Sequence, residues 1–403
     1  MHGWTPLGAE RLAVFAALVV LLSQGCGPKA VVDPQAGSLM REAPDVAVAR
    51  EQLEASAASL DVTTRRFALV SLMALDDEAG GGEWAARGLW DPAPAVQRVI
   101  ASALESRLPE PDTVSVLQEF VARPGLDPYV RCSAASVLAR AGDQGSLASV
   151  QAAMTAASAP WKAAPCALAA AQMGDADALL VLQSALEGGG LPLDMHFFGD
   201  LGRSGLSELS PSLREGLELM EEELELAVAA ALLELGDETG AVMLRRALGS
   251  SDPMRQLEAV DFLMASSSER ASALLRRAGG EVGLAASLAL IAKGEELPYL
   301  AVESLLSNDR ETRALACLAL GRWLTADLDA PRRASRLAHE ALLQSLLDPE
   351  EQVRLAAIRA LAGYGRPADA SALAPLVSDE TSSWQRVVAS AALLVLLQDP
   401  ARL

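Results

Sequence analysis

The chain has 403 residues, which is too long for one ordinary core but not for a repeat array, whose units pack only on their neighbours. Its net charge of −20 argues against nucleic-acid binding, which requires a cationic stripe, and no such stripe is visible in the sequence. Apolar residues make up 51% of the chain and aromatic residues only 4%, which favours helices packed through Ala, Leu and Val over β-sheets.

The N-terminal segment has the pattern of an export signal. Residues 12–22 are an uninterrupted apolar run, long enough for a signal-peptide core and too short to span a bilayer comfortably. The following Gly25-Cys26 resembles the lipobox of bacterial lipoproteins. This resemblance implies a signal peptide over residues 1–25 and lipid attachment at Cys26. A secreted or signal-anchored form is the alternative, because Ser23 and Gln24 depart from the lipobox pattern.

A tether then precedes the main body of the chain. Residues 26–44 contain Pro and Gly and read as a linker. By analogy with the sorting of enteric lipoproteins, Gly27 directs the protein to the outer membrane. We therefore expect an exported protein, an outer-membrane lipoprotein on the periplasmic face of the cell envelope.

Residues 45–403 repeat a unit of similar length. Most steps between equivalent positions are 30 to 34 residues; one of 25 marks a shortened unit around residues 266–281, and one of 41 marks an insertion around residues 325–333. The positions equivalent to Val353 are 64, 96, 130, 162, 193, 224, 257, 282, 312, 353 and 385.

Each unit has the features of two helices. A turn such as Asp348-Pro349 ends one helix, since proline cannot continue it, and caps the next. One pair of helices cannot bury its apolar face alone, so neighbouring pairs must stack. The sequence predicts an all-α fold, an α-solenoid of about ten antiparallel helix pairs. In the clearest unit, five apolar residues share one helix face: Val353, Ala356, Ala357, Ala360 and Leu361.

These units resemble HEAT repeats, in particular the short HEAT-like repeats of the phycobilin lyases, over about residues 45–400. In that family an Asp of the intra-repeat turn and an Arg early in the second helix form a structural ladder between repeats. Gln97 and Glu225 replace the arginine in two units, where we expect the ladder to be interrupted. The matching arginines are Arg65, Arg131, Arg313, Arg354 and Arg386, and the matching aspartates are Asp61, Asp127, Asp309 and Asp348.

The remaining cysteines and histidines give no pattern for chemistry. Cys132, Cys166 and Cys317 lie among small apolar residues of predicted helices, and we expect them to be buried small hydrophobic residues rather than disulfide, redox or metal sites. His196 and His339 have no partner at metal-ligand spacing. We expect no catalytic residue, no metal and no cofactor.

Two stretches leave alternatives open. Residues 195–198, Met-His-Phe-Phe, form either a bulky core plug or an exposed aromatic patch for a partner. Residues 387–397 are almost wholly apolar, although solenoid ends normally carry a polar cap. This last helix either folds against the previous pair or is a docking surface.

The expected function is a scaffold for protein–protein interaction on the face formed by the second helices. Its partners would be an unidentified protein and, through the lipid anchor, a membrane, but no nucleic acid. The alternative is an enzyme or chaperone resembling the bilin lyases, which would need a pocket and a ligand for a prosthetic group.

Overall fold

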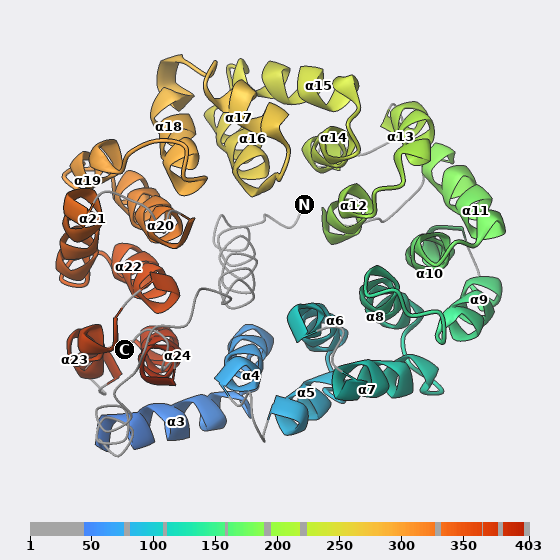
Figure 1. The fold of residues 1–403 in the computed structure, drawn as a ribbon, viewed down its shortest axis with the longest axis horizontal. Helices are drawn as coiled ribbons and strands as arrows, with labels where there is room; N and C mark the ends of the chain where they lie inside the picture. Colours follow the sequence, from blue (N-terminus) through green and yellow to red (C-terminus); the bar gives the residue numbers. More distant parts are fainter. Residues whose placement is uncertain are drawn as a thin grey trace. The chain divides into compact units, whose positions relative to one another are not determined.

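The computed structural model describes residues 44–75, 81–107, 111–157, 160–188, 195–217, 224–326, 332–364, 366–377 and 382–398. These ranges contain α-helices and short 3-10 helices but no β-strand, which confirms the predicted all-α fold (Figure 1). No helix in them combines the length and apolarity that crossing a bilayer requires. Cys26, the predicted signal peptide and almost all of the predicted tether lie outside the described residues.

The helices follow the repeat that the sequence predicts. Helices α3 to α24 form eleven successive pairs in the described chain, each with an odd-numbered first helix and an even-numbered second helix. Every predicted repeat position lies in an even-numbered helix or within two residues of its start. The fold is thus a HEAT-like helical-repeat solenoid.

The chain forms two compact units, and the residues of the second interrupt the sequence of the first. Unit 1 comprises residues 1–106 and 291–403, and unit 2 comprises residues 107–290. The helices of unit 1 are α3 (Pro44–Ser56), α4 (Val62–Leu75), α5 (Gly81–Leu89), α6 (Pro94–Ala103), α19 (Tyr299–Ser304), α20 (Arg310–Ala326), α21 (Arg332–Ser345), α22 (Glu351–Tyr364), α23 (Ala370–Leu373) and α24 (Ser383–Gln398).

Unit 2 contains shorter helices on average, and the boundary with unit 1 falls in the last turn of α18. Its helices are α7 (Pro111–Ala122), α8 (Pro128–Arg140), α9 (Leu147–Ala156), α10 (Pro160–Gln172), α11 (Ala176–Glu187), α12 (Met195–Arg203), α13 (Ser210–Gly216), α14 (Glu225–Glu234), α15 (Glu238–Leu248), α16 (Pro253–Ala265), α17 (Glu269–Leu275) and α18 (Gly283–Ala292). The seven-residue α17 accounts for the shortened unit in the sequence.

In unit 1 the even-numbered helices pack in the order α20, α22, α24, α4 and α6, so the last repeat lies directly against the first. The apolar α24 contacts α22 and the 3-10 helix η7 (Ala374–Val377) of its own end, and also α3 and α4 (Figure 1). The apolar stretch over residues 387–397 therefore folds against the previous repeat, as one alternative held, and its other side is covered by the first repeat.

The second helix α22 is buried on more than one face because it is flanked by α20 and α24 of its own layer and by the first helix α21. In α22 the five residues of the predicted face are buried, but so are Leu355, Ile358 and Arg359. Small residues allow close approach: a Cβ added at Gly321 of α20 would lie 2.6 Å from the Cβ of Ala360.

In unit 2 the expectation for two of the cysteines is wrong. Cys132 of α8 and Cys166 of α10 are buried, as expected, but they form a disulfide with a Cα–Cα distance of 4.5 Å. Their separation of 34 residues is one repeat length, so stacking of adjacent even-numbered helices places them side by side. Cys317 of α20 is a free, buried thiol. Phe197 and Phe198 of α12 are buried, which confirms the core-plug alternative.

Candidate functional site: the turns between the paired helices

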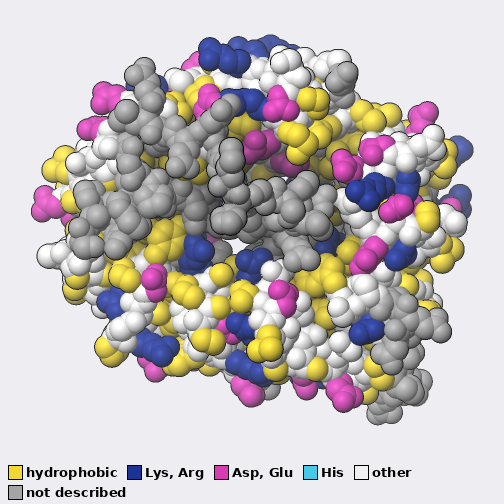
Figure 2. Space-filling view, turned by 180° about the vertical axis from the view of Figure 1, so that it is seen from behind, with side chains coloured by type: hydrophobic (Ala, Val, Ile, Leu, Met, Phe, Trp, Pro, Cys, Tyr) yellow, Lys and Arg dark blue, Asp and Glu magenta, His cyan; other side chains and the backbone are white. Residues whose placement is uncertain are grey.

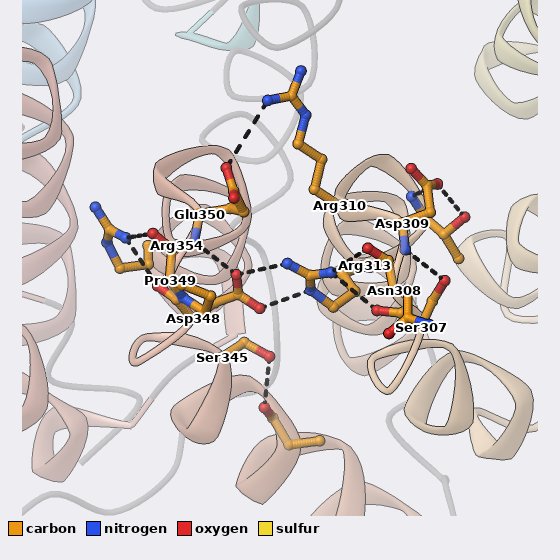
Figure 3. A network of polar contacts seen from close by, with 12 residues as sticks. Ser307, Asn308, Asp309, Arg310, Arg313, Ser345, Asp348, Pro349, Glu350 and Arg354 are labelled. Atoms are coloured by element: carbon orange, nitrogen blue, oxygen red, sulfur yellow. Dashed lines mark hydrogen bonds and ion pairs between the residues drawn. The ribbon is translucent and has the colours of Figure 1, made fainter.

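The side chain of Arg313 joins two successive repeats of unit 1 (Figure 3). Its Nε and Nη2 donate to Asp348 Oδ2 and Oδ1 at 2.8 and 3.0 Å, and Asp348 belongs to the turn of the next repeat. Its Nη1 donates to the carbonyls of Ser307 and Asn308 in its own turn, at 2.9 and 3.3 Å. The guanidinium thus closes one turn and fixes it to the next.

Arg65 repeats this arrangement near the start of α4. Its Nε and Nη2 donate to Asp91 at 2.7 and 3.0 Å, and its Nη1 donates to the Ser59 carbonyl at 2.6 Å. The bond to Asp91 raises the pKa of the Arg65 guanidinium, although burial acts against it. Arg65 and Arg313 keep only 13% and 12% of their side-chain surface exposed. Both pairs are therefore shielded far better than an ordinary surface ion pair.

Arg354 makes the same bonds to its own turn but meets a neutral acceptor in the next repeat. Its Nη1 donates to the carbonyls of Asp348 and Pro349, both at 2.8 Å. Its Nη2 and Nε reach Gln385 Oε1 of α24 at 3.0 and 3.3 Å. We call Arg65, Gln97, Arg313 and Arg354 the ladder residues, because each donates to a carbonyl six residues before it, in its own turn.

The other two arginines of the expected ladder differ. Arg131 donates through Nη2 to the Arg123 carbonyl at 2.7 Å, but its Nε has no hydrogen-bond partner among the described residues. The sequence carries Ala159 where the next turn would need an aspartate. For Arg386 the structure gives the backbone bond from its amide to the Ser382 carbonyl, at 3.0 Å.

Of the expected aspartates, only Asp348 accepts a ladder arginine in the contacts described. Asp61, Asp127 and Asp309 instead cap their own helices: Asp61 accepts from the Thr64 amide at 2.7 Å, Asp127 from the Tyr129 amide at 3.0 Å, and Asp309 from the Thr312 amide at 2.8 Å. These caps satisfy backbone amides that a helix start leaves without partners. The hydroxyl and amide of Thr312 hold the pKa of Asp309 below its usual range.

The acceptor for Arg65 is Asp91, a residue outside the expected ladder although its Asp-Pro pair marks a turn. The pKa of Asp348, the corresponding acceptor for Arg313, reflects two opposed effects. Burial acts to raise it, but bonds from Arg313 and from the Glu350 amide outweigh burial and leave it below its usual range.

The expected interruptions are only partial. Gln97 still closes its own turn, donating to the Asp91 carbonyl at 2.7 Å. Glu225 of α14 forms an ion pair with Arg255 of α16. Here the earlier repeat supplies the acid and the later repeat the base, the reverse of Arg313 with Asp348. The expectation of a break at Glu225 is therefore wrong, because an acidic side chain can join two repeats when the next one supplies the arginine.

Unit 2 contains a second row of polar contacts, which sequence reasoning missed. Asp143, Asp175 and Asp237 follow glycines with positive φ at the ends of even-numbered helices. Each accepts from the preceding odd-numbered helix: Gln118 to Asp143 at 2.8 Å, Gln151 to Asp175 at 2.7 Å, and Arg214 to Asp237. The signal was present as Gly-Asp pairs recurring at about one repeat length.

Other polar features of the described residues are few. The Nε2 of His339 lies 2.8 Å from Asp369 Oδ2, and both side chains are buried. An open depression of about 440 Å³ between α19 and α21 is lined by Tyr299, Arg333, Arg336, Leu337 and Glu340, a set without histidine, serine or cysteine. No group of three potential metal ligands gathers within the described ranges.

Comparisons with known proteins show similarity at the level of folding only. No family model matches the chain. No curated protein matches it either. Among solved structures, human deoxyhypusine hydroxylase is 18% identical, with 82% of this chain and 99% of that chain covered, at a TM-score of 0.31.

Two further solved structures are also similar to this chain. Importin beta is 13% identical, with 98% of this chain and 64% of that chain covered, at a TM-score of 0.33. Kap121p bound to Nup53p is 16% identical, with 98% of this chain and 45% of that chain covered, at a TM-score of 0.31. This chain thus spans about half the length of Kap121p. Similarity at this level carries no information about partners or activity.

Proposed function

We propose that this protein is an exported scaffold of the bacterial cell envelope that binds a protein partner and is lipid-anchored at Cys26. The observation that carries the scaffold role is the polar contact between successive turns, exemplified by Arg313 with Asp348. Because each contact fixes one repeat to the next, the repeats present their side chains in a defined register. Binding through such an array needs no reactive group.

The disulfide supports the proposed location. Cys132 and Cys166 are bonded across two adjacent repeats. Structural disulfides persist in oxidising compartments such as the periplasm and are rare in the cytosol. The apolar run over residues 12–22 and the Gly25-Cys26 pair supply the sequence pattern for export and acylation. On these grounds we propose that the protein lies on the periplasmic face of the cell envelope, and Gly27 after Cys26 favours the outer membrane by analogy with enteric lipoproteins.

The best candidate for the partner surface is the exposed face of α16, one of the second helices. Met254 and Leu257 are exposed apolar residues, and Glu258 and Asp261 complete the same face at helical spacing. Partial burial raises the pKa of Glu258; Arg255 acts to lower it, and Asp252 acts to raise it. Met side chains adapt to irregular surfaces. We infer that a protein partner covers this face.

The test is affinity capture of the tagged, full-length protein from mildly solubilised envelopes of its own host, with mass spectrometry of the retained proteins. The variant Met254→Ser/Leu257→Ser should lose a near-stoichiometric partner that the parent retains. Leu180→Ser on α11 is the matched control, because Leu180 is about as exposed as Met254 but lies on a first helix of the same unit. Circular dichroism should show the same helicity for all three proteins.

Three results would count against the proposal in different ways. Loss of the partner in the Leu180→Ser control would show that the α16 face is not the specific surface. Absence of any stoichiometric partner in the parent would remove the scaffold role. Recovery of the protein in the soluble fraction without lipid on Cys26 would remove the anchor but leave the scaffold role intact.

A further inference from the structure

Four turns of unit 1 each expose one large apolar side chain, and we call these four residues the turn edge. Leu60, Trp90, Leu306 and Leu347 have exposed fractions of 98%, 41%, 85% and 77%. Single exposed apolar residues are ordinary on protein surfaces. Here they recur at one structural position, the turn between a first and a second helix.

The recurrence has a fixed spacing in sequence for three of them. Trp90, Leu306 and Leu347 each precede the ladder residue of their own repeat by seven positions, and Leu60 precedes its ladder residue by five. The ladder residue bonds to turn carbonyls beside the apolar side chain, so the tip of the turn is held in a fixed conformation. The fold thus presents these side chains to solvent rather than leaving them there by chance.

Contacts between neighbouring repeats place the four turns along the same side of unit 1. Stacked helices lie about 8–10 Å apart, so roughly that distance separates the tips at Leu306 and Leu347, and likewise those at Leu60 and Trp90. The repeat of α23 and α24 lies between these two pairs. The contacts run in order through four pairs: Arg313 with Asp348, Arg354 with Gln385, Trp384 with Phe67, and Arg65 with Asp91.

The charges around the turn edge are largely compensated. Asp91 and Asp348 are paired with arginines, and Glu350 lies 3.9 Å from Arg310. Asp309 accepts bonds from both the amide and the hydroxyl of Thr312. Paired and hydrogen-bonded charges are less costly to bring near an apolar medium than isolated ones. Figure 2 shows acidic, basic and apolar side chains mixed over the described part of one face.

The spacing of the turn edge favours a lipid surface over a protein. The core of a protein interface is a contiguous, closely packed apolar patch. Isolated side chains on separate turn tips do not make such a patch, whereas a fluid bilayer surface can surround each tip individually. Leu and Trp are also the residues that suit insertion at the boundary between headgroups and acyl chains.

We propose that the turn edge of unit 1 rests in the interfacial layer of a lipid bilayer. The inference rests on the lipid anchor of the proposed function, which would hold the protein at that bilayer. The chain between Cys26 and the start of α3 at Pro44 can span at most about 60 Å. Within that reach the local concentration of bilayer is high, so weak insertion of four side chains is enough to orient the protein.

The experiment places a fluorescent label on the edge of the full-length, lipid-anchored protein in vesicles of phosphatidylethanolamine and phosphatidylglycerol. Leu306→Cys and Leu347→Cys are labelled separately with an environment-sensitive dye. Glu296→Cys, an exposed position in the connection between α18 and α19, is the matched control in the same unit. The native thiols do not interfere, because Cys132 and Cys166 are bonded and Cys317 is buried.

We expect the labels at positions 306 and 347 to shift their emission to the blue and to lose most of their intensity to nitroxide-bearing lipids. The label at position 296 should do neither. Labels at 306 and 347 that behave like the control on anchored protein would overturn the proposal. Labels that nitroxide-bearing lipids do not quench, but that are protected from aqueous iodide in native envelopes, would show that a protein covers the turn edge. This result would also overturn the proposal.

Failure of the anchor gives a different result. If the purified protein carries no lipid on Cys26 and stays in the aqueous phase, the variants are remade with Cys26→Ser, which removes the thiol that would otherwise be free, and the labelled proteins are added to preformed vesicles at increasing lipid concentration. A blue shift at 306 and 347 that rises with lipid would support the edge without the anchor. No response at any lipid concentration would overturn the edge proposal as well.

Discussion

The rings of Phe67 and Trp384 meet edge to face, with 5.2 Å between their centroids and 66° between their planes. Phe67 lies near the start of α4 in the first described repeat, and Trp384 lies near the start of α24 in the last. The pair therefore joins the two ends of the repeat array within unit 1. The first repeat thus covers apolar surface of α24 that would otherwise face solvent.

Removing either ring should destabilise unit 1. Phe67 is almost completely buried, and Phe67→Ala should cost about 3–5 kcal/mol of unfolding free energy. A double-mutant cycle with Trp384→Ala should show a coupling of about 0.5–1.5 kcal/mol, as expected of an edge-to-face pair. The measurement is urea unfolding of the four proteins. Strictly additive losses would show that the ring contact contributes nothing beyond separate burial.

Replacing Arg313, Arg354 or Arg336 by alanine should lower the free energy of unfolding by amounts that depend on the charge and burial of the partner that each arginine loses. Arg313→Ala leaves the Asp348 carboxylate, whose side chain is only 12% exposed, without its cation and should cost about 1.5–3 kcal/mol. Arg354→Ala loses a neutral acceptor and should cost about 0.5–1.5 kcal/mol. Arg336→Ala is the control, because its pair with Glu340 is exposed and should contribute less than about 0.5 kcal/mol. If Arg313→Ala and Arg354→Ala unfold at the same urea midpoint as the Arg336→Ala control, the ladder has no stabilising role.

The ion pair of Arg313 and Asp348 should make the stability of the fold depend on pH in a defined direction. The pKa of Asp348 is lower in the folded protein than its ordinary value of roughly 4. The unfolded chain therefore binds the proton more readily, so the contribution of Asp348 is fully present above about pH 4 and is lost as the pH falls through the folded pKa. Asp348→Asn should be less stable than the parent at about pH 7, and the difference should shrink below about pH 4. A difference that stays constant over this whole range would contradict the assignment.

The disulfide should be detectable by alkylation and should stabilise unit 2. In denaturant without reductant, iodoacetamide should modify Cys317 but neither Cys132 nor Cys166, which should react only after reduction. In the folded protein Cys317 should also resist, because burial raises its pKa to about 12 and leaves almost no thiolate. Reduction should cost unit 2 about 2–4 kcal/mol. Alkylation of all three cysteines without reductant would show that the bond does not form.

The fold could be predicted from the sequence because each repeat contains its own structural signals. Each unit carries its own Asp-Pro or Gly turn and its own apolar face, so a period near one repeat length predicts the helix pairs without knowledge of the neighbours. The pairing of Arg313 with Asp348 was also within reach, because the family resemblance relates positions in adjacent repeats.

The features that were missed depend on two repeats at once. The Cys132–Cys166 bond follows from a separation of one repeat length, which matters only after α8 and α10 are known to be adjacent. The contact of Phe67 with Trp384 joins the first and last repeats, and no periodic pattern indicates that distant ends meet. Asp91 escaped assignment because its partner Arg65 lies in the preceding repeat, while Gln97 of its own repeat is not an arginine.

Glycines at helix contacts provide the sharpest test of close packing. A Cβ at Gly321 would lie 2.6 and 2.7 Å from Cβ and Cα of Ala360, and one at Gly240 would lie 2.4 Å from the Ala229 carbonyl oxygen. Neither neighbour is the end of a flexible side chain, so Gly321→Ala and Gly240→Ala should each cost about 1–3 kcal/mol through forced separation of the helices. Gly82→Ala is the control: no atom lies within 4 Å of its Cβ position, so the change should stabilise α5 by about 0.4–1 kcal/mol. The opposite signs make thermal unfolding a clear readout, because a uniform shift for all three variants would mean that the helices do not pack closely enough to exclude a methyl group.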